Sequence, residues 1–185
     1  MIDDLISDAN RRMDKSVEST QTEFNTVRTG RASAALLDRI TVDYYGQPTP
    51  LQQLATINVP EPRMLTIQPF DPNSVKDIER AILESELGLT PSNDGKVIRL
   101  PIPQLTEERR KDLVKIVRQI AEDGKIAIRN VRRDADKHLK DLKTKGEVGE
   151  DDERRAEDRV QKLTDEHTAK IDDHLKRKEA EITEV

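Results

Sequence analysis

The spacing of hydrophobic residues differs between the two ends of this chain and its middle. In residues 1–28, apolar side chains recur every three or four positions, which is the spacing of one helix face. The residues on this face are Ile2, Leu5, Ile6, Ala9, Met13, Val17, Phe24 and Val27, with Thr20 at the remaining position. We predict a helix that ends near Gly30, because glycine readily adopts the left-handed conformation that terminates helices.

The same spacing returns after residue 105 and predicts two long helices. Thr106 is suited to an N-cap, and Glu107 and Glu108 suit the first turn of the helix that follows. Its apolar line consists of Leu113, Val117, Ile120, Gly124, Ala127, Ile128, Val131, Ala135, Leu139 and Leu142. After a turn at Gly146 and Gly149, the next line consists of Ala156, Val160, Leu163, His167, Ile171, His174, Leu175, Lys178 and Ile182. Because these lines are long and narrow, we expect an elongated antiparallel three-helix bundle.

The middle of the chain holds all nine prolines, from Pro48 to Pro103. Proline breaks the hydrogen-bond ladder of a helix, and short runs of β-branched and aromatic residues here predict strands instead. These runs are 40–45, 56–59, 64–68 and 97–100. Between the last two runs, Asp71 and Pro72 have the pattern of a helix start, and this helix is expected to end near Gly88.

The two patterns together predict an α+β fold with two domains. Residues 1–30 and 105–185 are expected to form the helical bundle, and residues 31–104 an inserted β/α/β domain. The chain would cross between the domains twice, at Gly30 and again at the segment Pro101, Pro103 and Gln104. Two parallel connections predict a hinge rather than a free linker.

The composition argues against an enzyme. Charged residues make up 37% of the chain, aromatic residues make up 2%, and cysteine is absent. A deep pocket and thiolate chemistry are therefore not expected. His138, His167 and His174 lack the spacing of a metal-binding pair, and no phosphate-binding loop or nucleophile motif is present. We predict no catalytic residue, no metal site and no cofactor.

The start of the chain does not have the pattern of a secretion signal. Met1 leads directly into an acidic amphipathic run that contains Asp3 and Asp4, without a basic segment or an apolar core. No apolar run approaches the roughly 20 residues that a membrane-spanning helix needs. These features predict a cytoplasmic protein.

Charge is unevenly distributed, although the net charge is only -5. Residues 106–146 contain 13 basic and 8 acidic residues, whereas residues 147–185 contain 8 basic and 14 acidic residues. On the basic helix, Lys125, Arg129 and Arg132 follow one stripe beside the apolar line, and Arg133 lies on the neighbouring stripe. Guanidinium groups suit bidentate contact with phosphate, so an RNA-binding face is one interpretation. A solvated helix face balanced by nearby acids is the other.

Two more arginines surround the glycine at which the first helix is expected to end. Arg28 and Arg31 lie on either side of Thr29 and Gly30, where a turn would present both to a phosphate. An ordinary helix end, with cations near its negative pole, explains the same residues equally well.

Several motifs in the same order along the chain resemble those of the ribosome recycling factor family. The motifs are Arg28-Thr29-Gly30-Arg31-Ala32, Tyr44-Tyr45-Gly46, Pro48-Thr49-Pro50, Gln53-Leu54-Ala55, Glu86-Leu87-Gly88-Leu89, Leu105-Thr106-Glu107-Glu108-Arg109-Arg110-Lys111 and Arg129-Asn130-Val131-Arg132-Arg133. The resemblance covers the full length. It implies an L-shaped protein, with a three-helix rod and a small arm on a two-stranded hinge.

The resemblance also implies a function in protein synthesis. Members of this family bind the ribosome after translation termination, between its subunits, and act with elongation factor G, whose GTP hydrolysis drives subunit separation. They have no enzymatic activity. By analogy, Arg132 with Arg129 and Arg133 would contact large-subunit ribosomal RNA, and the turn from Arg28 to Arg31 would contribute to hinge and binding. The alternative is a coiled-coil scaffold, which predicts oligomers where the recycling function predicts a monomer.

Overall fold

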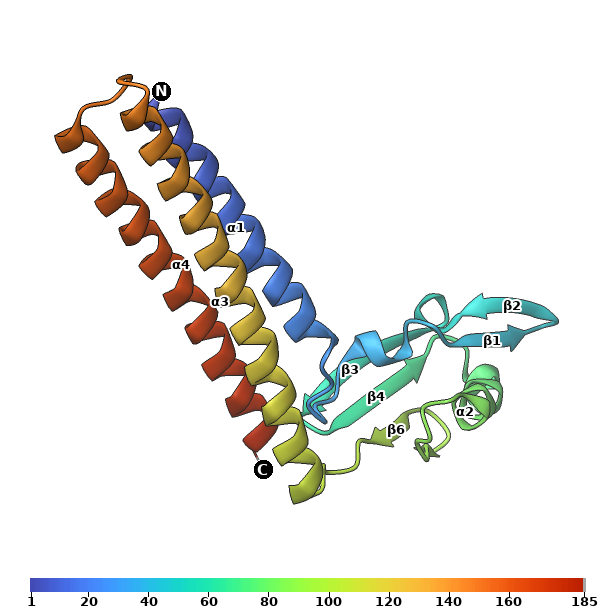
Figure 1. The fold of residues 1–185 in the computed structure, drawn as a ribbon. Coiled ribbons are helices and arrows are strands. Elements are labelled where there is room, and N and C mark those ends of the chain that lie inside the picture. Colours follow the sequence, from blue (N-terminus) through green and yellow to red (C-terminus); the bar gives the residue numbers. More distant parts are fainter. Residues whose placement is uncertain (185) are drawn as a thin grey trace. The chain divides into compact units, whose positions relative to one another are not determined.

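The computed structural model describes residues 1–184, which divide into two compact units. The first unit contains Met1–Thr29 and Glu107–Glu184, and the second contains Gly30–Thr106. The first is helical, and the second combines short strands with one α-helix (Figure 1). Among the described residues, no helix is both long and apolar enough to cross a membrane. The fold is therefore α+β, with a helical bundle interrupted in sequence by a small sheet-containing unit.

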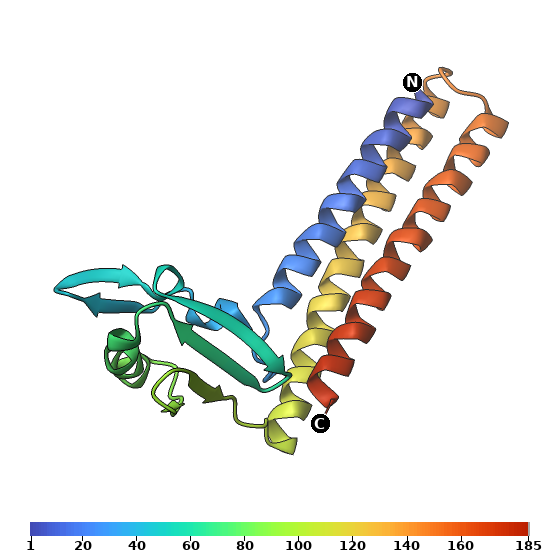
Figure 2. The ribbon, with the colours of Figure 1, turned by 180° about the vertical axis from the view of Figure 1, so that it is seen from behind.

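Three helices form the bundle: α1 (Ile2–Thr26), α3 (Glu107–Thr144) and α4 (Glu150–Thr183). They lie side by side along their length in both views, and α3 runs antiparallel to α1 and α4 (Figures 1 and 2). Helix α3 has 38 residues, which corresponds to about 57 Å at the usual rise per residue. The antiparallel three-helix bundle expected from the sequence is confirmed.

Helix α1 buries the predicted face but ends earlier than expected. Its buried residues are Ile6, Ala9, Met13, Val17, Thr20 and Phe24. The helix stops at Thr26, and Val27 is extended, with its N–H bonded to the carbonyl oxygen of Phe24. Gly30 has a positive φ of 77° but lies beyond this end. The prediction that Gly30 caps the helix is therefore wrong, because the backbone leaves the helical conformation at Val27.

The buried lines of α3 and α4 follow the predicted spacing with small shifts. On α3, Ala121 is buried while Ile120 is half-buried. On α4, Thr164 is buried while Leu163 is half-buried. Each shift places a smaller side chain in the interior and its larger neighbour at the edge. Sequence spacing alone does not distinguish these adjacent positions.

The second unit contains two antiparallel sheets. Strands β1 (Thr41–Tyr44) and β2 (Gln47–Pro50) form a hairpin. The other sheet has the order β3-β4-β6-β5, and each neighbouring pair is antiparallel. Its strands are β3 (Ala55–Glu61), β4 (Met64–Pro69), β5 (Ser92–Asn93) and β6 (Ile98–Pro101).

Strand β2 is, with the short strand β5, an element that the sequence pattern did not predict. It contains Pro48 and Pro50, which pair with Asp43 and Thr41 of β1. Because these prolines are two residues apart, both ring nitrogens face the same edge of β2. This edge is turned away from β1, so the absence of an N–H group at either proline costs no hydrogen bond of the hairpin. The connecting turn has positive φ values of 51° and 80°, as a two-residue type I′ hairpin requires.

Helix α2 (Val75–Glu84) contributes one wall of the core of the second unit. It follows a short 3-10 turn (Pro72–Ser74), in which the Asp71 carboxylate accepts a hydrogen bond from the Asn73 N–H at 3.0 Å. This bond, together with one from the Tyr44 hydroxyl, lowers the pKa of Asp71. The fully or nearly fully buried core residues include Val75, Ile78 and Ile82 of α2 and Leu65, Ile67, Ile98 and Leu100 of the sheet.

Candidate phosphate-binding face

Helix α3 carries the basic residues that the sequence singled out, directly beside the buried line. Ile128 and Val131 point into the bundle, with exposed fractions of 0% and 5%. Lys125, Arg129 and Arg132 are half-buried at the edge of this line. Their aliphatic stems therefore lie against the bundle, an arrangement that lets the charged ends reach solvent.

Two of these cations already have acidic partners. Lys125 forms an ion pair with Asp172 of α4. Arg129 donates from its Nη2 atom to Oε1 of Glu122 at 2.6 Å, seven residues earlier on the same helix. Both pairs are partly exposed to solvent. The positive charge at these positions is thus partly neutralised within the bundle.

Arg132 and Arg133 are different, because neither forms an ion pair or hydrogen bond with any residue between 1 and 184. Arg133 is exposed, and Arg132 is half-buried. Guanidinium groups without protein acceptors, held on a rigid helix, have the donors that a phosphate would accept. Among the four cations predicted on α3, these two are the ones that no protein carboxylate holds in an ion pair.

The partly buried carboxylate of Asp136 lies close to Arg132, and two acids of α4 are coupled to this region. Burial raises the pKa of Asp136, an effect that the nearby positive charge of Arg132 partly opposes. Burial and then the negative charge of Glu153 raise the pKa of Glu157 on α4. Lys143 approaches Glu153 at 3.8 Å. The electrostatic environment of Arg132 therefore includes an acid that is poorly solvated.

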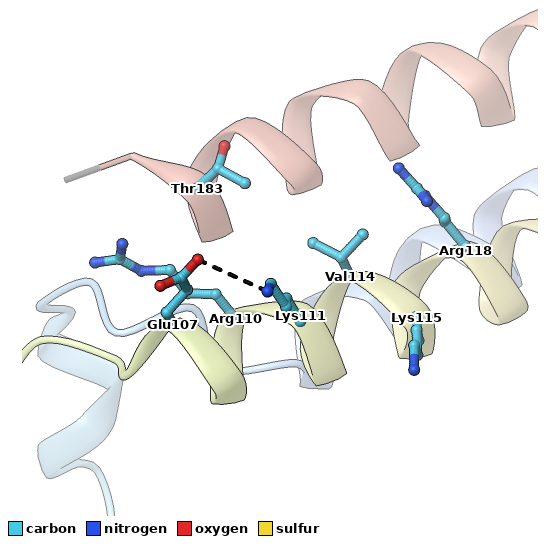
Figure 3. A pocket seen from close by; sticks show the side chains of 7 residues that line it. All are labelled: Glu107, Arg110, Lys111, Val114, Lys115, Arg118 and Thr183. Carbon is cyan, nitrogen blue, oxygen red and sulfur yellow. Dashed lines mark ion pairs between the residues drawn. The ribbon is translucent and has the colours of Figure 1, made fainter.

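A groove between the start of α3 and the end of α4 extends the basic surface, with a volume of about 420 Å³. Its lining residues are Glu107, Arg110, Lys111, Val114, Lys115, Arg118 and Thr183 (Figure 3). Lys111 pairs with Glu107 at 3.7 Å, and Arg118 pairs with Glu179 at 2.8 Å. The sequence pattern did not predict this groove, because the last turn of α4 forms part of its wall.

The arginines on either side of Gly30 belong to different units. Arg28 is the second residue after the end of α1, and Arg31 is the second residue of the second unit. Both are exposed. Since α1 ends at Thr26, Arg28 lies outside its last turn, and the role of the two arginines stays a prediction.

The two segments predicted to form a hinge contact the same β-turn in the second unit. The N–H of Ala32 donates to the Pro62 carbonyl at 2.7 Å, and the N–H of Ile102 donates to the Arg63 carbonyl at 2.8 Å. Pro101 is the last residue of β6. A Cβ atom on Gly30 would lie 3.0 Å from Cγ of Leu105, next to Gln104. Both connections therefore start from defined positions at one end of the sheet.

The buried histidine of the bundle is satisfied by protein groups. His167 is 2% exposed, and its Nδ1 and Nε2 atoms lie 2.7 Å from the Leu163 carbonyl oxygen and the Asp14 carboxylate. His138 is exposed. Within residues 1–184, no group of three or more His, Cys, Asp or Glu residues is arranged to hold a metal ion. His167 therefore has a structural role in packing α4 against α1.

The bundle, its inserted sheet unit and the basic flank of α3 define a class of two-unit binding proteins. The ribosome recycling factor family model matches residues 20–183. The chain therefore belongs to the ribosome recycling factor family, which consists of non-catalytic translation factors, and it is not an enzyme.

Several relatives match over nearly their whole length. A ribosome-recycling factor of Geobacillus sp. (strain WCH70) is 57% identical over 185 residues, which is 100% of both chains. A ribosome-recycling factor of Rubrobacter xylanophilus is 56% identical over 180 residues, or 97% of each chain. These identities cover both units of the fold.

Two solved structures have the same fold. A solution structure of a ribosome recycling factor matches with a TM-score of 0.70 and 43% identity, covering 100% of this chain and 98% of the other. A second match has a TM-score of 0.62 and 48% identity, covering 98% of both chains. It comes from models of the T. thermophilus ribosome recycling factor and E. coli elongation factor G bound to the E. coli post-termination complex.

Proposed function

We propose that this protein binds the post-termination ribosome at the interface between its subunits and, together with elongation factor G, splits it for recycling. GTP hydrolysis by that partner would provide the energy, and the protein itself would need no cofactor. Family membership and the relative bound with elongation factor G to a post-termination complex support this proposal. Such a function belongs in the cytoplasm and is carried out by a monomer.

The observation that carries the proposed RNA contact is that Arg132 and Arg133 on α3 form no ion pair or hydrogen bond within residues 1–184. Arg132 and Arg133 would bind phosphates of large-subunit ribosomal RNA, with Arg129 and Lys125 beside them on the same helix. The second unit has the exposed aromatic residues Tyr45 and Phe70, whereas the only aromatic residue of the bundle, Phe24, is buried. Binding by the bundle would therefore depend on backbone and shape rather than on base stacking.

The two connections between the units would act as a hinge. We infer that residues 1–30 with 105–185, and residues 31–104, behave as two domains that move about Gly30 and the segment Pro101, Pro103 and Gln104. Arg28 and Arg31 lie at one connection and would add phosphate contacts there. Helix α3 is continuous over 38 residues, which supports a rigid lever whose partner-driven motion is transmitted through the hinge.

Replacing Arg132 with Ala tests the RNA contact. We expect ribosome affinity to fall about 10- to 150-fold, because a hydrogen bond to a charged group is worth about 1.5–3 kcal/mol. Equilibrium binding of a fluorescently labelled protein to ribosomes measures this change. The matched control is Arg11→Ala, which removes an exposed arginine of α1 that pairs with Asp8. Equal affinity of Arg132→Ala and the wild type would refute the contact.

Ribosome splitting tests the proposed function as a whole. Light scattering should report subunit separation only when the protein, elongation factor G and GTP are all present. Sedimentation at several concentrations should give a monomer, whereas the scaffold alternative predicts oligomers that grow with concentration. A protein that forms such oligomers and leaves ribosomes intact would contradict the proposal.

A further inference from the structure

The outer surface of α3 carries a continuous basic strip. At about 100° per residue, six positions of α3 fall within a sector of about 40° on its outer surface, with half-buried Arg129 on the side of the sector nearer the buried line. We call these positions the α3 strip: Lys111, Lys115, Glu122, Arg129, Arg133 and Lys140. Five are basic, and the strip extends for about 44 Å along the helix axis. Glu122 is therefore the one acid in a surface otherwise suited to a polyanion.

Within the α3 strip, Glu122 is bonded to Arg129. The Arg129 Nη2 atom donates to Glu122 Oε1 at 2.6 Å across two helical turns. Helix ion pairs usually join residues three or four apart, so the arginine has to extend along the surface to reach a carboxylate seven residues away. The side chains are 38% and 51% exposed, which leaves the pair open to competition from solvent ions or a phosphate.

The other cations of the strip are less constrained. Lys115, Arg133 and Lys140 have no ion pair with residues 1–184, and Lys111 makes a longer contact with Glu107, at 3.7 Å. Arg129 is thus the member of the strip whose charge is most directly neutralised. A phosphate that approaches the strip at Arg129 must displace or share the Glu122 carboxylate.

We infer that Glu122 is a positioning residue that attenuates RNA binding, by holding Arg129 extended along α3 and occupying one of the N–H donors that a phosphate would otherwise take. The inference rests on the proposed function. A carboxylate and a phosphate present similar oxygen acceptors to a guanidinium group, so Glu122 acts as an internal competitor. It limits the strength of binding at Arg129, as suits a factor that must also leave the ribosome.

Removing the negative charge of Glu122 should therefore strengthen binding. An exposed ion pair is weak, so the expected gain in affinity for Glu122→Gln is about 1.4- to 5-fold. The salt dependence should change as well. When RNA displaces Glu122, the freed carboxylate attracts a cation and cancels one released counterion. Without this carboxylate, the slope of log affinity against log salt should steepen by roughly 0.7–0.9.

The experiment measures binding of the labelled full-length protein to purified large ribosomal subunits over a series of KCl concentrations. The variants are Glu122→Gln, Glu122→Ala, Arg129→Gln and the double variant Glu122→Gln/Arg129→Gln. The matched control is Asp123→Asn. Asp123 is the next residue, is also exposed, and accepts a hydrogen bond from neutral Gln119 at 2.9 Å, so its change alters the net charge equally without releasing a cation.

The expected pattern distinguishes the inference from a general effect of charge. Both Glu122 variants should bind more tightly with a steeper salt slope, Asp123→Asn should match the wild type, and Glu122→Gln should have no effect once Arg129 is Gln. Unchanged or weaker binding of the Glu122 variants, or the same gain in the Arg129→Gln background, would overturn it. Failure of the wild type to bind large subunits would instead refute the proposed function.

Discussion

Replacing Gly124 with Ala should destabilise the bundle, although alanine forms helices better than glycine. Gly124 is a buried residue of α3. A Cβ atom at this position would lie 2.2 Å from Oγ1 of Thr20 on α1 and 3.0 Å from Cδ1 of Ile171 on α4. Side chains of α1 and α4 therefore pack directly against α3 where it has no side chain, and the added methyl group has no space.

The magnitude follows from two opposing effects. Alanine should stabilise an isolated helix by about 1 kcal/mol relative to glycine. Overpacking of a well-filled core typically costs about 1–3 kcal/mol. Thr20 cannot move without a penalty, because its Oγ1 donates a 2.7 Å hydrogen bond to the Ser16 carbonyl, worth about 0.5–1.5 kcal/mol. We expect a net loss of about 1–3 kcal/mol in the free energy of unfolding.

Urea unfolding followed by circular dichroism at 222 nm measures this loss, because the helices dominate that signal. The control is Gly149→Ala, at the N-cap of α4, where the nearest atom to the added Cβ is 4.0 Å away, so that only the capping preference, about 0.5–1 kcal/mol, is lost and no packing. Thr20→Ala removes both Thr20 atoms that would clash. In that background, Gly124→Ala should become neutral or stabilising, which a double-mutant cycle would detect.

The result that would refute this reasoning is a Gly124→Ala protein as stable as the wild type, or more stable. The higher helix propensity of alanine would then outweigh the packing cost of the added methyl group. The close packing of Thr20 and Ile171 against α3 would not require glycine at position 124. Equal destabilisation of Gly124→Ala with and without Thr20→Ala would show that another contact causes the loss.

Two further predictions concern buried polar groups of the bundle. Since burial raises the pKa of Asp136, the folded protein favours its protonated form, and that contribution is lost as pH rises through the folded pKa. Asp136→Asn should therefore be more stable than the wild type in urea unfolding at pH 7, with the advantage disappearing near pH 4, and a less stable variant at pH 7 would contradict this. His167→Ala should lose about 2–4 kcal/mol in the same assay, because the ring is buried and bonded to Asp14, whereas exposed His138→Ala should change by less than about 0.5 kcal/mol. Equal effects of the two histidine changes would argue against the role of His167.

Much of the candidate site could be anticipated from the order of residues along one helix. Because α3 is regular, the spacing of Lys125, Arg129 and Arg132 determines that they lie beside the buried line through Ile128. What spacing could not show is which charges are already neutralised. The partner of Lys125 is Asp172 on another helix, and the partner of Arg129 lies seven residues away, so both depend on side-chain reach and helix packing.

The fold also has features that the sequence pattern predicts and others that depend on tertiary contacts. Apolar spacing of three and four residues was enough to predict the three long helices, because a helix in water is stabilised mainly by the face that it buries. The nine prolines likewise excluded a long helix from residues 48–103, and the one α-helix there, α2, occupies a proline-free stretch between Pro72 and Pro91. The end of α1 at Thr26, the pairing of β2 through non-bonding proline positions and the contact of Gly124 with Thr20 were decided only by tertiary structure. Each depends on atoms far apart in the chain, and no local pattern records how closely they approach.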